Sequence, residues 1–307
     1  MKILLTGAAS HLARALLPAL LAREDVEIVI GLDWREGFVT HPRYRHRQVD
    51  LREAPLAEIL TDIDTVIHLA FAVIARDADG RRLSRATRRA INVTASARLF
   101  AACLEAGVER LLCVSSAAVY GPQPDERCVP ESAPRRPLAG FAYAEDKAAM
   151  EAALDALQDQ PHGPRVIRLR PHVILGPHCQ PLLRRMLAQP FYLAAGRHHP
   201  LQCVHEDDVA RALLLALDCP RSATFNIAAD DALPFADMLR LRHSRAWPLP
   251  RPLAVAGHAL LRSLSPAWGE RGILESLCHP LVVCTERAKR ELGWRACYST
   301  RDCITHM

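Results

Sequence analysis

Short apolar segments alternate with helical patterns through the first half of this 307-residue sequence, and this alternation constrains the fold more than any other feature. Consecutive strands that are separated by a helix run parallel and are joined by right-handed crossovers. The sequence therefore predicts an α/β fold of the Rossmann type, with helices on both faces of a doubly wound parallel sheet. The expected strands are Ile3–Thr6, Glu27–Asp33, Thr65–Ala70, Leu111–Ser115 and Arg165–Leu169, and the expected helices are Leu12–Ala22, Leu56–Leu60, Ser84–Ala106 and Tyr143–Leu157.

The pattern loosens from about Gly176, where helices dominate and proline becomes frequent. Two of the helices expected there are Asp207–Leu217 and Pro252–Leu264. We therefore expect residues 1–175 to form the sheet domain and residues 176–307 to form mainly a smaller, mostly helical lobe. The segment at about 200–230 is expected to return to the sheet domain.

Composition and charge restrict the class of protein. Half of the residues are hydrophobic and 24% are charged, as in an ordinary globular enzyme. The net charge of +5 is modest and its basic residues are scattered, which argues against a nucleic-acid partner. No apolar run is long enough for a signal peptide or a membrane span, so we expect a cytoplasmic protein without a membrane partner. The ten cysteines contain no C-x-x-C pair, and we expect reduced thiols that mostly pack as small apolar side chains.

The segment Thr6–Ala13 joins the first expected strand to the first expected helix. A tight turn of small residues at this place lets a pyrophosphate approach the unpaired amides of the helix N-terminus. Only Gly7 remains of the glycines in a Gly-x-x-Gly-x-x-Gly pattern, because Ser10 and Ala13 occupy the other two positions. Ala13 still permits close packing of helix against strand, whereas the Ser10 side chain is expected to narrow the phosphate site.

Asp33 ends the second expected strand, where a carboxylate can accept hydrogen bonds from both hydroxyls of an adenosine ribose. The same charge repels a 2′-phosphate, so the sequence favours NAD over NADP. Arg35 tempers this preference, since its guanidinium could bind that phosphate. The alternative is that Asp33 is only a surface acid at the end of a strand and binds no ribose. With NAD as the cofactor, residues 1–175 are the cofactor domain and residues 176–307 mainly bind substrate.

Tyr143 and Lys147 stand four residues apart at the start of an expected helix and therefore share one face. A free phenol is a poor base at neutral pH, and a nearby ammonium favours its ionised form. Only Lys2, Lys147 and Lys289 are lysines among 39 basic residues, so a lysine at this position indicates a function. Ser116 follows another expected strand and could hold the substrate oxygen that Tyr143 protonates or deprotonates.

In these pieces the sequence resembles the extended short-chain dehydrogenase/reductases grouped as NAD-dependent epimerases/dehydratases. The resemblance runs nearly end to end, and it implies a homodimer formed through the helices that contain Asn92 and Tyr143. Further matching pieces are Val49–Leu51, His68–Ala70, Ile91–Val93, Ser115–Gly121, Arg170–Pro171, Gly176–Pro177, Val204–Ala210, Phe225–Ala228 and Ala288–Trp294. The catalytic residues implied are Ser116, Tyr143 and Lys147, and the cofactor residues implied are Gly7, Ala9, Ser10, His11, Leu12, Asp33, Asp50, Leu51, Leu69, Ala70, Ala72, Asn92, Ser115, Tyr143, Lys147, Pro171 and Val173.

Departures from the family pattern reduce the range of reactions that we expect. Dehydratases of the group carry Asp-Glu after the active hydroxyl residue, but here the pair is Ala117-Ala118, which cannot move protons. Nucleotide-sugar epimerases usually carry an Asn that contacts the substrate diphosphate, and Val173 stands at that position. They also tend to carry an Arg directly before the motif that begins here with Val204-His205, and this chain has Cys203 at that position. Arg197, His198 and His199 could replace the missing charge. His198 and His199 lie in the preceding segment without further ligands at a suitable spacing, so no metal site is predicted.

The sequence thus predicts an NAD-dependent dehydrogenase, reductase or epimerase that acts on a hydroxyl or carbonyl substrate. A nucleotide-sugar 4-epimerase is the alternative, since Ser116, Tyr143 and Lys147 would serve it equally. A dinucleotide sensor without catalysis is a third hypothesis, which the Tyr143–Lys147 pair disfavours. We expect a small or largely apolar alcohol or ketone as substrate, although Arg184 and Arg185 could supply charge for a diphosphate.

Overall fold

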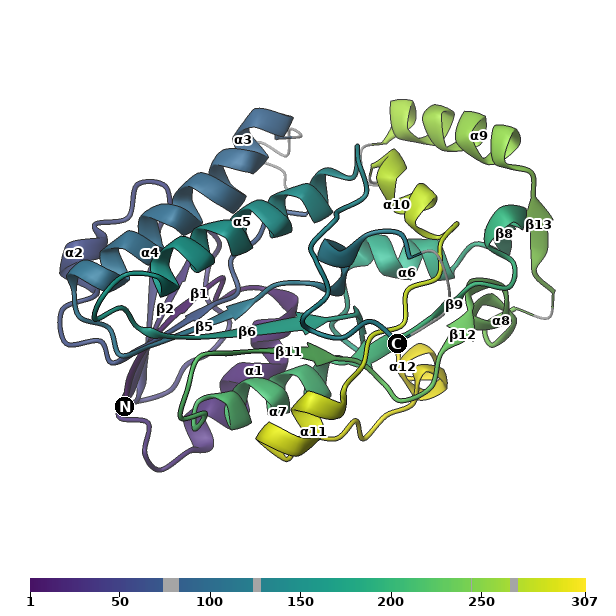
Figure 1. Cartoon of the computed structure of the whole chain (residues 1–307). Helices are drawn as coiled ribbons and strands as arrows, with labels where there is room; N and C mark the ends of the chain where they lie inside the picture. The colour runs from purple at the N-terminus through teal and green to yellow at the C-terminus, as the bar shows by residue number, and fades with distance from the viewer. Residues whose placement is uncertain (74–82, 124–127, 244, 266–269) are drawn as a thin grey trace.

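The computed structural model describes residues 1–73, 83–123, 128–243, 245–265 and 270–307 (Figure 1). Its centre is a seven-stranded sheet in the order β11-β6-β5-β4-β1-β2-β3, and every neighbouring pair is parallel. This confirms the predicted doubly wound Rossmann-type fold. The strands are β1 (Lys2–Thr6), β2 (Ile28–Asp33), β3 (Tyr44–Gln48), β4 (Thr65–His68), β5 (Arg110–Val114), β6 (Arg165–Pro171) and β11 (Ala223–Ile227).

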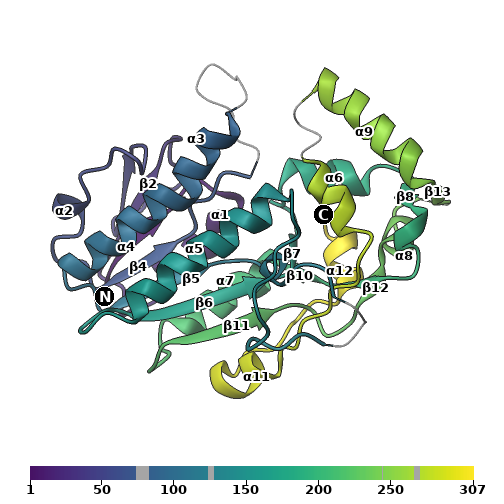
Figure 2. The ribbon, with the colours of Figure 1, turned by 45° about the horizontal axis from the view of Figure 1, so that its top comes forward.

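Helices cover both faces of this sheet (Figures 1 and 2). One face packs against α1 (His11–Ala22), α7 (Glu206–Ala216) and α11 (Glu286–Leu292), and a single apolar cluster joins these helices to the strands. The other face packs against α2 (Leu56–Ile59), α4 (Ala95–Glu105) and α5 (Ala142–Gln158) through a second cluster. These helices cover the faces of the sheet, so the carboxyl ends of the strands remain available for a ligand-binding site.

The expected single helix Ser84–Ala106 is interrupted. It consists of α3 (Arg85–Arg89), a π-helical turn Ala90–Thr94 and α4. A π-helical turn adds a residue to the helix and changes the direction of the side chains within it. Here it places the buried Asn92 against the loop that follows β4, where its side chain bonds both backbone groups of Ala72.

The second lobe has its own apolar cluster of buried residues, to which α6, β8, α8 and α12 contribute. Short strand pairs hold it together: β7 with β10, β9 with β12 and β8 with β13. Its elements are β7 (Val173–Leu175), α6 (Pro181–Leu187), β8 (Phe191–Leu193), β9 (Pro200–Leu201), β10 (Cys203–His205), β12 (Leu233–Pro234), α8 (Phe235–Arg240), β13 (Trp247–Leu249), α9 (Arg251–Leu264), α10 (Arg271–Ser276) and α12 (Thr300–Thr305). Short 3₁₀ turns lie at Ala117–Tyr120 and Ala194–Gly196.

One pair of cysteines departs from the expectation of reduced thiols, since a disulfide joins Cys128 to Cys284. The backbone brings them together, because the N–H of Val129 bonds the carbonyl of Val282 and the N–H of Cys284 bonds the carbonyl of Val129. No local spacing could have revealed a pair 156 residues apart. The free cysteines Cys103, Cys113, Cys179, Cys203, Cys219 and Cys303 are buried, as expected for small apolar side chains. Across the described residues, every helix falls short of the length and apolarity that a membrane crossing needs.

Candidate active site

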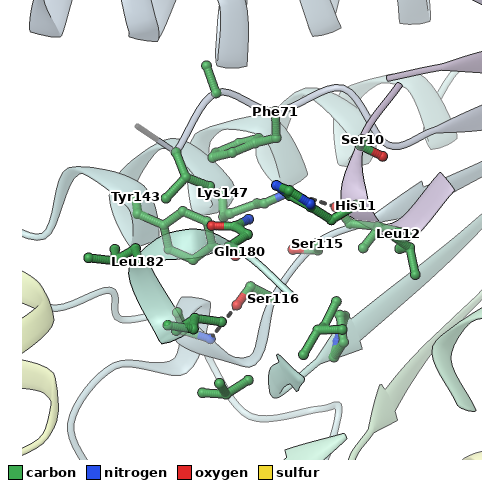
Figure 3. A pocket seen from close by; sticks show the side chains of 18 of the residues that line it. Ser10, His11, Leu12, Phe71, Ser115, Ser116, Tyr143, Lys147, Gln180 and Leu182 are labelled. Atoms are coloured by element: carbon green, nitrogen blue, oxygen red, sulfur yellow. Dashed lines mark hydrogen bonds between the residues drawn. The ribbon is translucent and has the colours of Figure 1, made fainter. Parts of the chain in front are cut away.

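A cavity of about 720 Å³ opens where the carboxyl ends of the central strands face the second lobe. It brings together all of the predicted catalytic residues and all but two of the predicted cofactor residues, as Figure 3 shows in part. The two exceptions are Ala9 and Asn92, which lie behind the lining. The predicted residues in the lining are Gly7, Ser10, His11, Leu12, Asp33, Asp50, Leu51, Leu69, Ala70, Ala72, Ser115, Ser116, Tyr143, Lys147, Pro171 and Val173.

The turn after β1 passes so close to the loop after β4 that only a glycine fits at its first position. Gly7 has φ +72°, and a Cβ at this position would lie 2.6 Å from the backbone nitrogen of Ala70. The strand-end loops of β1 and β4 therefore approach each other at backbone distance. Ser10 caps α1, because its Oγ accepts a hydrogen bond from the N–H of Ala13 at 3.2 Å. Its hydroxyl is thus turned back onto the helix, where it occupies one amide of the N-terminus.

Asp33 is buried at the end of β2 and is held on two sides. Its Oδ2 accepts from the N–H of Ala9 at 3.0 Å, which gives Ala9 a positioning role behind the cavity. Its Oδ1 accepts from the N–H of Arg35 at 3.0 Å and from the Arg35 Nε at 3.1 Å. The carboxylate and the guanidinium considered in the sequence are thus paired with each other at the cavity wall. Asp50 is paired in the same way with Arg52, at 2.7 Å.

Lys147 lies beneath the cavity on the first turns of α5. Its Nζ donates to the carbonyl of Val114 at 2.7 Å and lies 3.8 Å from the centre of the Phe71 ring. Burial lowers the pKa of the Lys147 ammonium to about 8. The Phe71 ring was not predicted, although its place directly after the expected strand Thr65–Ala70 was a usable signal. A cation over a ring face is stabilised electrostatically, so Phe71 helps to fix this lysine.

Tyr143 stands one turn before Lys147 on the same face of α5 (Figure 3). Its ring meets that of Phe71 edge to face at 5.4 Å and lies 5.6 Å from that of Phe141. Burial raises the pKa of the Tyr143 phenol, and a hydrogen bond with Ser116 acts in the opposite direction. Ser116 itself caps the 3₁₀ turn after β5, where its Oγ accepts from the N–H of Ala118 at 3.2 Å. The geometry therefore places a phenol, a hydroxyl and an ammonium around one cavity.

A buried ionic network that the sequence did not predict holds the loop carrying Ser116. Arg170 on β6 donates from Nε to Oε1 of Glu151 on α5 at 2.9 Å and from Nη1 to the hydroxyl of Tyr120 at 2.8 Å. The Tyr120 hydroxyl donates to Oδ1 of Asn226 on β11 at 2.7 Å. These side chains come from distant parts of the chain, so no local spacing could indicate them. Together they fix α5 relative to the Ser116 loop.

The part of the cavity that lies on the second lobe is mostly apolar. Arg184, one of the two arginines considered for a diphosphate, does not line it and donates instead to the carbonyls of Gly176 and Pro177. Its polar lining residues include Gln180, Arg185, Ser276 and His279. The apolar lining of this lobe comes from Leu182, Leu183, Met186, Ile273, Leu277, Pro280 and Leu281, and the sheet domain adds Leu138 and Phe141. Among the described residues, no cluster of three or more histidine, cysteine, aspartate or glutamate side chains could hold a metal ion.

The inner half of the cavity fits a dinucleotide. Gly7 clears the turn at the N-terminus of α1, and Asp33 offers a buried carboxylate at the end of β2. The model of the NAD dependent epimerase/dehydratase family matches residues 3–228. The chain belongs to this family. This confirms the family resemblance, and with it the prediction of an NAD-dependent enzyme.

Relatives of known sequence include both uncharacterized proteins and dehydratases. The chain is 30% identical to an uncharacterized protein of Mycobacterium tuberculosis, over 97% of this chain and 81% of the relative. It is 28% identical to the dTDP-D-glucose 4,6-dehydratase of Homo sapiens, over 71% of this chain and 63% of that enzyme. This chain has Ala117-Ala118 directly after Ser116.

Solved structures of similar fold include complexes with NAD and complexes with a nucleotide sugar. MoeE5 in complex with UDP-glucuronic acid and NAD is 24% identical and has a TM-score of 0.77, covering 100% of this chain and 97% of that one. UDP-glucuronic acid 4-epimerase from Bacillus cereus in complex with NAD is 19% identical with a TM-score of 0.76, covering 100% and 94%. At these identities the likeness supports the fold alone.

Proposed function

We propose that this protein transfers a hydride between NAD and a hydroxyl or carbonyl substrate, with Tyr143 as the acid–base. The observation that carries the proposal is the convergence of Tyr143, Lys147 and Ser116 on one cavity. The nicotinamide cofactor, when bound, would accept a hydride from a hydroxyl substrate in its oxidised form or donate one to a carbonyl substrate in its reduced form. Gly7 and the N-terminus of α1 would receive its pyrophosphate, and Asp33 would receive its adenosine ribose.

The side chains of this chain then manage one proton. The Ser116 hydroxyl holds the substrate oxygen, and the Tyr143 phenol gives or takes the proton on that oxygen. The ammonium of Lys147 favours the phenolate by its charge and reaches ribose hydroxyls as a compact donor. Phe71, which lies against both residues, keeps the two side chains in place and water away.

Removing the Tyr143 hydroxyl tests the mechanism. We expect Tyr143→Phe to lower kcat by about 10²–10⁴-fold, because it removes the group that moves the proton. Fold and NAD affinity should stay close to those of the wild type, since no other group is lost. Lys147→Met should weaken NAD binding as well as turnover, which calorimetry and steady-state kinetics measure separately. Near-normal turnover by Tyr143→Phe would exclude the mechanism and favour a dinucleotide sensor.

We propose a small or largely apolar alcohol or ketone as the substrate. A diphosphate requires charge-assisted donors around it. Val173 offers none at the position of the family's Asn, and Arg184 is engaged with backbone carbonyls. Leucine, isoleucine and methionine side chains dominate the facing wall, which suits an apolar group. Arg185 also lines this wall.

A nucleotide-sugar 4-epimerase is the second candidate, favoured by the structural likeness to proteins solved with UDP-glucuronic acid. Calorimetry with uridine, thymidine and guanosine diphosphate sugars, each with NAD present, separates the two. We expect no micromolar binding of these sugars, together with stabilisation by hydrophobic ketones in a thermal-shift assay. Micromolar binding of any one of the sugars would instead make the epimerase the better assignment.

We also propose a homodimer through the helices that contain Asn92 and Tyr143. These helices lie side by side on one face of the sheet (Figure 2). Light scattering of the eluting protein, which gives the mass in solution, is the test. A monomeric mass would reject this assembly without bearing on the reaction.

A further inference from the structure

Helix α9 presents an apolar face to solvent. Leu253, Leu260 and Leu264 are spaced seven and four residues apart, so they share one face of the helix. Their exposed fractions are 61%, 63% and 77%. Ala254 is the single buried residue of the helix, and the three leucines belong to none of the apolar clusters of the described residues.

The polar side of α9 faces in another direction. Arg251, His258 and Arg262 repeat the spacing of seven and four on a different face of the helix. Arg251 donates from Nη2 to Oε2 of Glu275 on α10 at 2.8 Å, which ties this side to the body of the lobe. A surface helix of a globular protein ordinarily turns its apolar face inward and its charges outward. Here the orientation is reversed.

Two aromatic side chains lie near the start of α9. Trp247 on β13 pairs in register with Phe191 on β8, and the two are 52% and 49% exposed. Figures 1 and 2 show β13 and β8 at one end of α9, which is the outermost element of this lobe. We call Phe191, Trp247, Leu253, Leu260 and Leu264 the α9 surface.

The chain segment that forms α9 carries basic charges only, and one of them, Arg251, is paired with Glu275 of the neighbouring α10. Residues 245–265 contain Arg245, Arg251 and Arg262 and no aspartate or glutamate. Within the part of the chain that the structure describes, neither Arg245 nor Arg262 forms a salt bridge. An exposed apolar helix face with aromatic side chains near its start, and arginine on the polar face and next to the helix, is the combination by which a helix lies in the headgroup layer of an anionic bilayer.

We propose that the α9 surface docks the protein on an anionic lipid surface. The contact needs no membrane-spanning helix, because the helix lies in the plane of the interface. A second copy of the chain is a weaker occupant, since the basic charge of this segment favours an anionic partner over another copy of the same charge. The docking does not rest on the enzymatic activity. Docking on a lipid surface is compatible with an apolar substrate. Helix α10 is joined to α9 by the Arg251–Glu275 pair, and its residues Ile273 and Leu277 line the cavity.

Vesicle flotation of the full chain tests the proposal. We compare vesicles of phosphatidylcholine with vesicles of phosphatidylcholine and phosphatidylglycerol, and expect binding mainly to the second. Leu260→Ser with Leu264→Ser should lower the partition coefficient by about tenfold or more, because two exposed apolar side chains that would enter the bilayer are lost. Arg245→Glu should lower it by about fivefold or more on the anionic vesicles.

Arg301→Glu is the matched control, because this exposed arginine lies on α12, away from the α9 surface, and should leave flotation unchanged. Circular dichroism should be the same for all variants, since the altered side chains are exposed or half-exposed. No flotation with the anionic vesicles, or equal flotation of wild type and the leucine variant, would overturn the proposal. A dimer that the leucine variant dissociates, without vesicle binding, would assign the surface to a second copy instead. A loss of turnover by Tyr143→Phe bears on neither outcome.

Discussion

At the scale of single residues, the pairing of Asp33 with Arg35 decides which dinucleotide the cavity prefers. The Asp33 carboxylate is buried and fixed by the Ala9 N–H, whereas the Arg35 side chain is half exposed and can move. A bound adenosine ribose would compete for oxygens that Arg35 now contacts. A 2′-phosphate would face the fixed negative charge and could gain only the mobile positive one.

We therefore expect the wild type to bind NAD more tightly than NADP. Asp33→Asn should reduce this preference by about tenfold or more, since it removes one charge from beside the added phosphate. Arg35→Met should lower the affinity for NADP and leave the affinity for NAD nearly unchanged. Calorimetric titration of both cofactors against the three proteins measures this. Equal or tighter binding of NADP by the wild type would refute the assignment of Asp33.

The sequence identifies the residues of the site where chemistry and local spacing coincide. Tyr143 and Lys147 are one helical turn apart, and Asp33 directly ends a strand, so their convergence on the cavity was predictable. Phe71 and the Glu151–Arg170 pair were not predicted. Their importance lies in contacts between segments that are far apart in the chain, and a single sequence does not show such contacts.

At the scale of elements, buried strands were easier to predict than edge strands and irregular helices. β1, β4 and β5 each contain a short apolar run and are buried almost throughout, as parallel strands inside a sheet are. β3 is the edge strand Tyr44–Gln48, mostly exposed and rich in arginine, and it was missed because it has no apolar run. The π-helical turn at Asn92 escaped prediction because helical periodicity continues on both sides of it.

The N-terminus of α1 provides a prediction at this scale. Ser10 stands where the family pattern has glycine, and its Oγ occupies the N–H of Ala13. Ser10→Gly should raise the affinity for both NAD and NADP severalfold, because it widens the space at the amides that receive the pyrophosphate. Glycine is itself an acceptable helix cap, so the free energy of unfolding should fall by only about a few tenths of a kcal/mol.

Ser10→Ala is the control for this variant. It removes the cap as well but keeps a Cβ at the phosphate site, and it should cost about 1 kcal/mol of stability. Titration by calorimetry and urea unfolding measure the two effects separately. An unchanged NAD affinity in Ser10→Gly would mean that the serine does not narrow the site.

At the scale of the whole molecule, two buried histidines on the central strands make stability depend on pH. His68 ends β4 between the hydroxyls of Thr6 and Ser96, at 2.7 and 2.9 Å, and burial lowers its pKa to about 3. His172 follows β6, and burial lowers its pKa to about 4. Its Nδ1 accepts from the N–H of Val173 at 2.9 Å, so its Nε2 carries the proton and faces the carbonyl of Leu281. The native fold thus holds both rings neutral.

In the unfolded chain each ring takes up a proton below a pKa of about 6.5. Between that value and the native pKa the unfolded state binds more protons, so the free energy of unfolding falls as pH falls. From pH 7 to pH 5 we expect each histidine to cost about 2 kcal/mol, or about 4 kcal/mol for the pair. Urea unfolding at the two pH values, followed by circular dichroism, measures the fall.

The fall in the free energy of unfolding should be about half as large in His172→Gln as in the wild type. In His198→Gln, which alters an exposed side chain, the fall should be the same as in the wild type. Equal stability of the wild type at pH 7 and pH 5 would show that the rings are not held neutral, because the carboxylates are still largely ionised in both states over this range.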